Sequence, residues 1–438
     1  MSTIENVARR GVLKCMLSAG AVVPALAFGI KPSTIQDPAR TPVSFAAVAG
    51  EKGGQDVYGP YEVVEDWPKP LSQLPGHEHW TWGCIDGVFA ESPNRVFIFQ
   101  RGELPLLTRP VSTPIPEFGP SLSFPINSLP FRNAGQGPVS SAPGPESEGV
   151  GNWKGKYGVD GRWENCLLVL DAEGNVVEAW TQWDKLFKRP HAIYINPYDP
   201  EKSVWVVDDA RSAIFKFSND GKNLLQTIGT PNEPGDDETH YGRPTFLAWL
   251  PDGTMFVADG YTNTRVVKLD KDGKYLMEWG KKGTPPNDKR PGYFNTVHGI
   301  AVDPITRYVY VTDRQNGRAQ VFDENGHFLD QWSYGLPPGH GRTQGVYYLY
   351  MSGDRYLWAA DATTSKILKY DRDGHFLYSW GSFGSWPGAF WGVHQFSVDQ
   401  DGNLYVAEVE NGRVQKFRPR KGANPELLVG QPVRAAWK

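Results

Sequence analysis

The sequence predicts an all-β fold, a six-bladed β-propeller whose ring is closed by an N-terminal strand. The stretch ADGYTNTRVVKLDKDGKYLMEWG, residues 258–280, returns in similar form from residue 312 and again from residue 360. Turns that end in glycine recur at spacings of 47, 52, 53 and 48 residues, with the glycines at 174, 221, 273, 326 and 374. The 48 Gly and 36 Pro among 438 residues suit many short strands joined by turns. A repeat of about 50 residues is typical of a propeller blade.

Each repeat has the same order of strands and turns. An apolar first strand ends in Asp-Pro or Pro-Asp-Gly, and a second strand ends in Asp or Glu. A third strand, rich in β-branched and aromatic residues, ends in an Asp-x-x-Gly-like turn, and a fourth ends in Trp or Gly. Short alternating apolar segments bounded by turn residues indicate strands rather than helices.

The sixth repeat begins at Gly392 and lacks a fourth strand of its own. The segment YEVVEDWP, residues 61–68, has strand character and belongs to no other repeat. An unpaired sheet edge exposes backbone N–H and C=O groups, so pairing this segment with the last repeat would close the ring. We therefore expect residues 51–438 to form the propeller.

The first repeat is interrupted. RVFIFQRG, residues 95–102, is expected to be its second strand, whereas its third strand begins at Asn165. Residues 103–164 between them are rich in Pro, Gly and Ser and show no periodicity. Long insertions of this kind are either functional lids or loops without fixed structure, and the sequence leaves both open.

Residues 1–50 predict a signal peptide and linker. Arg9 and Arg10 precede an apolar run over residues 15–30, which is too short to span a bilayer comfortably. The arginine pair resembles the bacterial twin-arginine signal, and Ala25 to Ala27 offers a small-residue cleavage site. We expect an exported protein, periplasmic or extracellular, with an uncleaved N-terminal anchor as the alternative. No later segment is apolar enough to span a membrane.

Charge and cysteine content restrict the partners. A formal charge of -4 and a pI near 6.2 argue against nucleic acid, which favours basic surfaces. After removal of the signal, Cys84 and Cys166 remain, and in an oxidising compartment they could form a disulfide. Because a closed ring needs no second copy to be stable, we expect a monomer that acts on a small molecule or a peptide.

One position at the start of each first strand points to a metal site. Aligning the six repeats gives, in order, Asp86, His191, Thr245, His298, Gln344 and His394 at this position. Alternate repeats therefore carry histidine, and a threefold rotation of the ring relates them. A single channel histidine is most often a satisfied polar group, but three of only 9 histidines in equivalent places favour a metal. Three neutral imidazoles with an open fourth position are typical of catalytic zinc.

Residues at the ends of second strands supply further candidates on the same face. Arg101, Tyr261 and Arg314 stand out because they break the repeat pattern. A neighbouring dication favours the phenolate form of a tyrosine, which makes Tyr261 a candidate general base. The two arginines could hold a carboxylate and stabilise developing negative charge. The acidic residues that recur in the repeats are expected to cap turns instead: Asp208, Asp259, Asp313, Asp361 and Glu408.

These segments resemble a known family. RVFIFQRG, ADGYTNTRV and VTDRQNGRAQVF resemble the segments of peptidyl-α-hydroxyglycine α-amidating lyases that carry a substrate arginine, the catalytic tyrosine and a second arginine. The repeats themselves resemble NHL repeats. The resemblance extends from roughly Trp80 to Arg418 outside the insertion, and the histidine spacings of 107 and 96 residues are similar to those of the family.

The resemblance implies a zinc-dependent lyase that splits the C–N bond of a C-terminal α-hydroxyglycine into a peptide amide and glyoxylate. It implies that His191, His298 and His394 hold the zinc and that Tyr261 takes up the hydroxyl proton. Arg101 and Arg314 would hold the substrate carboxylate and its polar end.

One departure concerns a structural calcium ion that the resemblance also implies. The family has aspartate directly after the third histidine, where this chain has Gln395. The family's calcium also uses backbone carbonyls that would correspond to Val88 and Ile193. Asp86 could restore the missing charge or serve as a further zinc ligand. Because the insertion lies on the face of the expected metal site and could cover it, the substrate is either a peptide or another α-hydroxy-amide or hemiaminal-type compound.

Two other functions compete with the lyase. A zinc hydrolase could use the same histidines with a metal-activated water. A propeller without catalytic activity could bind protein or carbohydrate through its loops, as many repeat rings do.

Overall fold

The computed structural model describes residues 58–106, 113–114, 123–124, 162–284, 288–334 and 345–437. The chain divides into two units, Met1–Val43 and Ser44–Lys438, and every described residue lies in the second. The expected signal segment and most of the insertion therefore lie outside the described residues.

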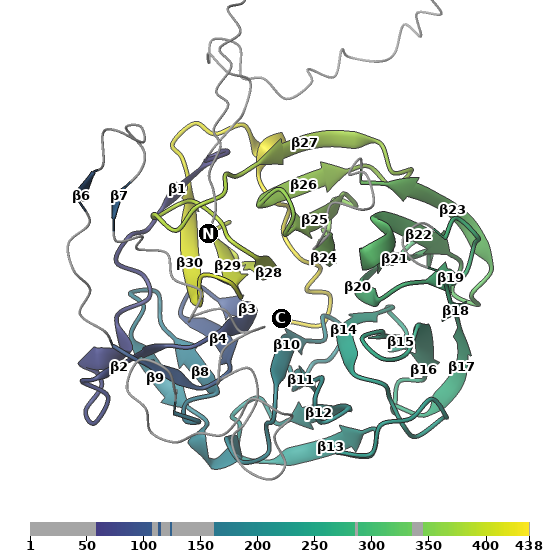
Figure 1. The fold of residues 1–438 in the computed structure, drawn as a ribbon, viewed down its shortest axis with the longest axis horizontal. Helices are drawn as coiled ribbons and strands as arrows, with labels where there is room; N and C mark the ends of the chain where they lie inside the picture. The colour runs from purple at the N-terminus through teal and green to yellow at the C-terminus, as the bar shows by residue number, and fades with distance from the viewer. Residues whose placement is uncertain are drawn as a thin grey trace, which may run out of the picture. The chain divides into compact units, whose positions relative to one another are not determined.

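Six four-stranded antiparallel sheets are arranged as blades around a central channel (Figure 1). Blades one and two consist of β3 (Ile85–Ser92), β4 (Arg95–Gln100), β8 (Leu167–Leu170), β9 (Val176–Ala179), β10 (Pro190–Ile195), β11 (Val204–Asp208), β12 (Ala213–Phe217) and β13 (Leu224–Ile228). Blades three and four consist of β14 (Pro244–Trp249), β15 (Met255–Asp259), β16 (Arg265–Leu269), β17 (Tyr275–Trp279), β20 (Val297–Val302), β21 (Val309–Asp313), β22 (Arg318–Phe322) and β23 (Phe328–Ser333). Blades five and six consist of β24 (Val346–Met351), β25 (Leu357–Asp361), β26 (Lys366–Tyr370), β27 (Phe376–Trp380), β28 (Val393–Val398), β29 (Leu404–Glu408), β30 (Arg413–Pro419) and β1 (Tyr61–Val63).

The prediction of six blades closed by an N-terminal strand is confirmed. Strand β1 pairs antiparallel with β30, with Tyr61 opposite Pro419 and Val63 opposite Phe417. The first strand of the last blade, β28, also contacts β3 of the first blade, so the ring is continuous along its inner wall. Pairing the two ends of the domain leaves blade six with four strands, as in the other blades.

Short elements lie outside the blade strands. Besides the blade strands, the described residues form β2 (Trp80–Trp82), β5 (Glu103–Pro105), β6 (Thr113–Pro114), β7 (Ser123–Phe124), β18 (Lys281–Lys282) and β19 (Tyr293–Phe294). Single 3-10 turns occur at η1 (Leu71–Gln73), η4 (Thr181–Trp183), η5 (Arg314–Asn316) and η6 (Pro425–Leu427). Within the described ranges, no helix is long and apolar enough to cross a membrane.

Tryptophan and glycine interlock between neighbouring blades. Trp279 ends the fourth strand of blade three and packs against the turn glycine of blade four, Gly326, where an added Cβ would lie 2.8 Å from the indole. Trp332 packs on Gly374 of blade five in the same way, at 2.5 Å. Both glycines have positive φ, so side chains are excluded by backbone conformation as well as by space. The terminal Trp and the Asp-x-x-Gly turn recognised in the sequence are thus two halves of one contact.

The insertion leaves and re-enters blade one at a fixed neck. Strand β5 begins at Glu103, which pairs through a β-bridge with Arg162 on the returning chain. The fully buried Glu103 carboxylate accepts hydrogen bonds from Arg162 Nη2 (2.7 Å) and Asn165 Nδ2 (2.7 Å) and lies 2.9 Å from His77 Nδ1. The His77 side chain is half-buried against this carboxylate.

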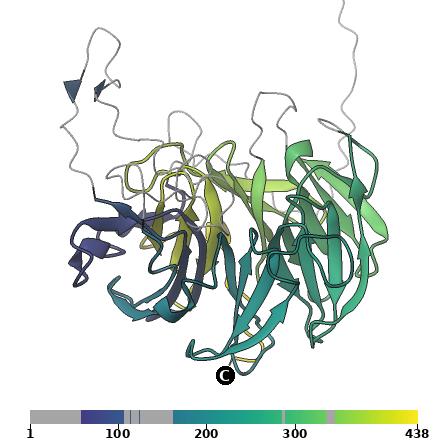
Figure 2. The ribbon, with the colours of Figure 1, turned by 60° about the horizontal axis from the view of Figure 1, so that its bottom comes forward.

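Residues 429–437, here called the strap, lie across the channel on the face of the Asp-Pro turns. Their polar contacts reach several blades: Val429 N–H donates to Tyr61 Oη, Tyr350 Oη–H to the Gly430 carbonyl, Arg434 Nη2 to the Val398 carbonyl, and Trp437 Nε1 to the Asn196 carbonyl. The C-terminus lies near the ring centre in Figure 1 and below the blades in Figure 2.

Candidate metal centre and active site

Three buried imidazoles meet in the channel. His191, His298 and His394 lie on β10, β20 and β28, and one ligand atom from each lies within 4.8 Å of the others. Their ring centroids are 4.6 to 5.6 Å apart. The structure therefore brings together the three histidines that the alternation of the repeats predicted.

Backbone irregularities turn these side chains into the channel. Pairing between β10 and β11 jumps from Pro190–Asp208 to Ala192–Val207, which makes His191 the extra residue of a bulge. His394 is skipped in the same way between β28 and β29. The pairing of β20 with β21 is also irregular at His298. A bulge redirects a side chain relative to the regular pleat, which explains why one position per blade faces the axis.

A bulge at the equivalent place in blade five corrects the alignment made from the sequence. Tyr347, not Gln344, occupies this position, because pairing passes from Val346–Asp361 to Tyr348–Ala360. In blade one, Asp86 occupies it, as predicted. The six positions around the channel are therefore Asp86, His191, Thr245, His298, Tyr347 and His394.

Backbone carbonyls orient two of the three imidazoles. Nδ1 of His298 lies 2.7 Å from the Tyr347 carbonyl, and Nδ1 of His394 lies 2.8 Å from the Asp86 carbonyl. Since a carbonyl only accepts, each Nδ1 carries the hydrogen and Nε2 keeps its lone pair. In metal sites, such outer contacts fix the ring and its tautomer.

The three rings are held neutral. Burial lowers the pKa of His394 to about 3 and lowers that of His298 well below its ordinary value. Burial and the other two imidazoles have the same effect on the pKa of His191. His191 Nδ1 is buried without a hydrogen-bond partner among the described residues. Three neutral nitrogen donors, one with an unsatisfied ring nitrogen, are a donor set that fits zinc.

Tyr261 joins this cluster. Its hydroxyl lies 2.9 Å from His298 Nε2 and 3.2 Å from His191 Nε2. It lies in the connection between β15 and β16, inside the segment ADGYTNTRV. The predicted general base is thus in direct contact with two of the predicted metal ligands.

Phe246 provides an apolar surface beside the imidazoles. Its ring centroid is 5.0 Å from that of His191 and 5.2 Å from those of His298 and His394. It is fully buried, and the sequence analysis did not single it out. A phenyl ring in contact with all three imidazoles excludes water from that side of the cluster.

Arg101 and Asp86 form a buried ion pair. Arg101 Nη2 donates to Asp86 Oδ1 at 2.7 Å, and Nε donates to the Pro190 carbonyl at 3.2 Å. Burial raises the pKa of Asp86 to about 6 in spite of the opposing effect of Arg101. The Asp86 carboxylate is not grouped with the three imidazoles. The structure places Asp86 as a partner of Arg101 and, through its carbonyl, of His394, whereas the sequence left open that it is a further zinc ligand or restores a missing charge.

The cysteines are separate thiols. Cys84 Sγ lies 3.0 Å from Asp86 Oδ2, and both Cys84 and Cys166 are buried and unbonded to each other. Burial raises the pKa of each thiol well above its ordinary value. The disulfide that the sequence left open is not formed.

Arg314 approaches the cluster from blade four. Its Nη2 donates to Tyr347 Oη at 3.0 Å, and its Cζ lies 4.1 Å from the centre of the Tyr347 ring and 6.0 Å from that of Tyr261. Burial raises the pKa of Tyr347 to about 12, so this phenol stays protonated. The sequence analysis missed Tyr347 because the alignment of blade five was displaced by three residues.

Two more arginines near the cluster were also missed. Arg189 and Arg243 flank the buried carboxylate of Asp209, with Arg243 Nε 2.9 Å from Oδ2 and Arg189 Nε 3.6 Å from Oδ1. The sequence did contain a signal for these two arginines. The dipeptide Arg-Pro stands directly before the channel-facing residue of blades two and three.

Gln395 occupies the position where the resemblance implies a calcium ligand. Its Oε1 accepts from Ile193 N–H at 3.2 Å, and its Nε2 donates to the Ile193 carbonyl at 2.9 Å. Val88, the other expected carbonyl ligand, is a fully buried member of the core on β3. The amide therefore joins blades six and two across the channel and satisfies both backbone groups of Ile193 without a cation.

The hydrogen bonds between Gln395 and Ile193 should contribute to stability. Gln395→Met should lower the free energy of unfolding by about 3 kcal/mol, because it leaves a buried N–H and C=O unpaired. Urea denaturation measures the change, and Gln182→Met, at an exposed position, is the control expected to have little effect. A wild-type unfolding midpoint that falls with a calcium-selective chelator would instead indicate a cation at Ile193.

Comparisons with known proteins agree with the fold described above. The NHL repeat family model matches residues 390–417, in blade six. Peptidyl-glycine alpha-amidating monooxygenase A of Xenopus laevis is 36% identical over 170 residues, which are 38% of this chain and 18% of that protein. Peptidyl-alpha-hydroxyglycine alpha-amidating lyase 1 of Drosophila melanogaster is 31% identical over 284 residues, which are 60% of this chain and 51% of that protein. The chain thus spans about half of the fly protein and less than a fifth of the frog protein.

Among solved structures, virginiamycin B lyase from Staphylococcus aureus has a TM-score of 0.43 at 12% identity, covering 80% of this chain and 97% of that chain. A similarity of this size adds nothing to the assignment. The NHL repeat, the six blades and the relatives named for the lyase agree with one another. The chain is thus a six-bladed propeller with an NHL repeat in its last blade, and it is similar to peptidyl-α-hydroxyglycine α-amidating lyases.

Proposed function

We propose that this chain is a zinc-dependent lyase that cleaves the C–N bond of a peptidyl-α-hydroxyglycine, or a related α-hydroxy-amide, to an amide and glyoxylate. The contact of the Tyr261 hydroxyl with His298 and His191 carries this proposal. The reaction needs a metal ion and a proton acceptor at the same substrate hydroxyl. This contact puts a proton acceptor beside three neutral nitrogens that suit zinc.

The overall reaction moves one proton. The carbinol oxygen loses it, the C–N electron pair goes to the amide nitrogen, and that nitrogen gains a proton as the carbon becomes an aldehyde. A zinc ion held by His191, His298 and His394 would polarise the substrate hydroxyl and make its proton more acidic. Tyr261, in the phenolate form that a neighbouring dication would favour, would take that proton and return it to the leaving nitrogen.

Arginines on the same side of the channel suit the substrate carboxylate. Arg314 is held by the Tyr347 hydroxyl and ring, which fixes the direction of its guanidinium. Arg101 has an ionic partner in Asp86, which offsets much of its charge, so its main contribution would be support of the Asp86 carbonyl that orients His394. A fixed guanidinium binds a carboxylate at low entropic cost and sets the distance of the carbinol carbon from Tyr261.

The direct test uses α-hydroxyhippurate with protein reconstituted with one equivalent of zinc. We expect equimolar benzamide and glyoxylate, loss of turnover after chelation, and recovery on adding zinc back. Benzoate in place of benzamide would instead indicate a hydrolase, because the acyl C–N bond would then have broken. Absence of turnover above the protein-free rate would favour a propeller that only binds ligands.

Export remains part of the proposal. Residues 1–50 have the features of a twin-arginine-type signal, and we infer a periplasmic or extracellular location for the mature chain.

A further inference from the structure

Arg243 has an unusual backbone conformation for its residue type. Its φ is 64°, in the left-handed region, and it lies two residues before the channel-facing position of blade three. Blades five and six place glycine at the same point, Gly345 and Gly392, each with φ of 70°. A side chain other than glycine costs free energy in this conformation, and such strain is concentrated at functional sites.

The guanidinium of Arg243 lies between a buried carboxylate and the ring of Tyr261. Nε and Nη2 donate to Asp209 Oδ2 at 2.9 and 2.5 Å, and Cζ lies 4.8 Å from the centre of the Tyr261 ring. Burial alone would raise the pKa of Asp209, but Arg189 and Arg243 lower it, so the carboxylate remains ionised as their partner. The Arg243 carbonyl also accepts the Tyr261 N–H at 3.3 Å.

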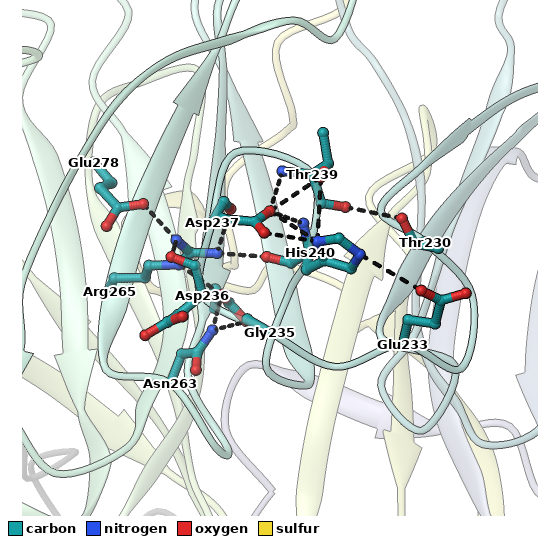
Figure 3. A network of polar contacts seen from close by, with 11 residues as sticks. Thr230, Glu233, Gly235, Asp236, Asp237, Thr239, His240, Asn263, Arg265 and Glu278 are labelled. Atoms are coloured by element: carbon teal, nitrogen blue, oxygen red, sulfur yellow. Dashed lines mark hydrogen bonds and ion pairs between the residues drawn. The ribbon is translucent and has the colours of Figure 1, made fainter.

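The loop that carries Arg243 is anchored to blade three (Figure 3). Arg265 donates to the carbonyls of Asp236 and His240, at 2.5 and 2.7 Å, and Asn263 Nδ2 donates to the Gly235 carbonyl at 2.7 Å. Gly242 N–H, directly before Arg243, donates to Asp259 Oδ1 at 2.8 Å. Arg243 therefore follows a segment whose backbone groups are held by three side chains of blade three, Asp259, Asn263 and Arg265.

Tyr261, in contrast, lies in a short connection and is only half-buried. Its ring contacts the imidazoles of His191 and His298, with centroids at 5.4 and 5.2 Å, and the guanidinium of Arg243. A cation over a tyrosine ring is attracted to the π-face and restricts the directions in which the ring can move.

We propose that Arg243, held by Asp209, is a positioning residue that fixes the ring of Tyr261 and so keeps its hydroxyl on His298 and His191. The consequence for turnover rests on the proposed lyase function, whereas the positioning itself does not. A ring released by loss of Arg243 would spend less time in contact with the imidazoles, and a displacement of about 1 Å can reduce turnover by about a hundredfold.

The chain contains a matched control in blade five. Arg355 also has a left-handed backbone, with φ of 65°, and donates through Nε and Nη2 to a buried carboxylate, that of Asp303. Its side chain is 24% exposed and that of Arg243 25%, and both carboxylates are fully buried. Arg355→Gln therefore removes the same kind of ion pair from the same kind of backbone, away from Tyr261.

The kinetic experiment compares Arg243→Gln, Arg355→Gln, Tyr261→Phe and the double variant Arg243→Gln/Tyr261→Phe on α-hydroxyhippurate. We expect kcat of Arg243→Gln to fall by about tenfold or more, with KM within about twofold and the visible spectrum of the cobalt-substituted protein unchanged. Arg355→Gln should retain the wild-type kcat, and the double variant should be no slower than Tyr261→Phe. A wild-type kcat in Arg243→Gln, or losses that multiply in the double variant, would overturn the proposal.

A second measurement decides the positioning without any turnover. A double-mutant cycle of Arg243→Gln and Tyr261→Leu, followed by urea denaturation, should show a coupling of about threefold in the unfolding equilibrium constant. Additive effects would contradict the contact. A wild-type protein that releases no glyoxylate would overturn the lyase function alone, and the cycle would still accept or reject the role of Arg243.

Discussion

His298→Ala is expected to abolish stoichiometric zinc binding and, with it, turnover. The substitution removes one of three nitrogens that converge in the channel, and two imidazoles do not form the three-ligand set typical of catalytic zinc. Loss of an outer contact to a metal ligand already costs about ten- to a hundredfold in affinity, so loss of the ligand itself should cost more than about a hundredfold. Elemental analysis after dialysis, and competition with a chromogenic chelator, measure the affinity.

The control for this prediction is His327→Ala. His327 lies in an exposed turn against Asp323, and its side chain is 77% exposed. It should keep one zinc per chain. Because His298 is fully buried, its replacement by alanine also leaves a cavity, so His298→Gln should be measured beside it, with urea denaturation to show that both variants fold. One equivalent of tightly bound zinc in a folded His298 variant would contradict the proposed metal centre.

Tyr261→Phe should lower kcat by about 10² to 10⁴-fold while leaving zinc content unchanged. The substitution removes the hydroxyl that lies 2.9 Å from His298 Nε2 but keeps the ring that stacks on Arg243. General acid–base groups contribute rate factors of this size. The measurement is a kcat and KM determination on α-hydroxyhippurate, with zinc content determined on the same sample.

Tyr275→Phe provides the comparison, since Tyr275 lies on the outer strand β17 of the same blade, away from the imidazoles. It should behave as wild type. If Tyr261→Phe retained wild-type turnover with zinc bound, another group would have to move the proton, and the proposed role of Tyr261 would be wrong.

The sequence was sufficient for the fold because each blade contains its own turn signals. Asp-x-x-Gly turns and terminal tryptophans recur, and the structure explains them as one contact between neighbouring blades, such as Trp279 on Gly326. The histidines were found for a related reason. The bulge that turns a side chain into the channel recurs at the same place in each blade, so equivalent positions in the sequence are equivalent in space.

What the sequence did not predict depends on distances between strands. Tyr347 was missed because its bulge lies in the apolar run VYYLYM, in which no polar residue marks the register. The pairing of Asp86 with Arg101 follows from how β3 is bulged against β4, which composition does not reveal. The hydrogen bonds from Gln395 to Ile193 join residues that are 202 positions apart. Contacts of this kind are set by the closed ring rather than by local pattern.

The arrangement of the histidines has a consequence for the order of events during biosynthesis. His191, His298 and His394 belong to segments separated by 107 and 96 residues, and the ring that gathers them is sealed by the pairing of β1 with β30. A growing polypeptide that has completed only four blades possesses two of the imidazoles and no sealed ring. Capture of the proposed zinc ion by all three imidazoles would therefore require that blade six has been made and the ring closed.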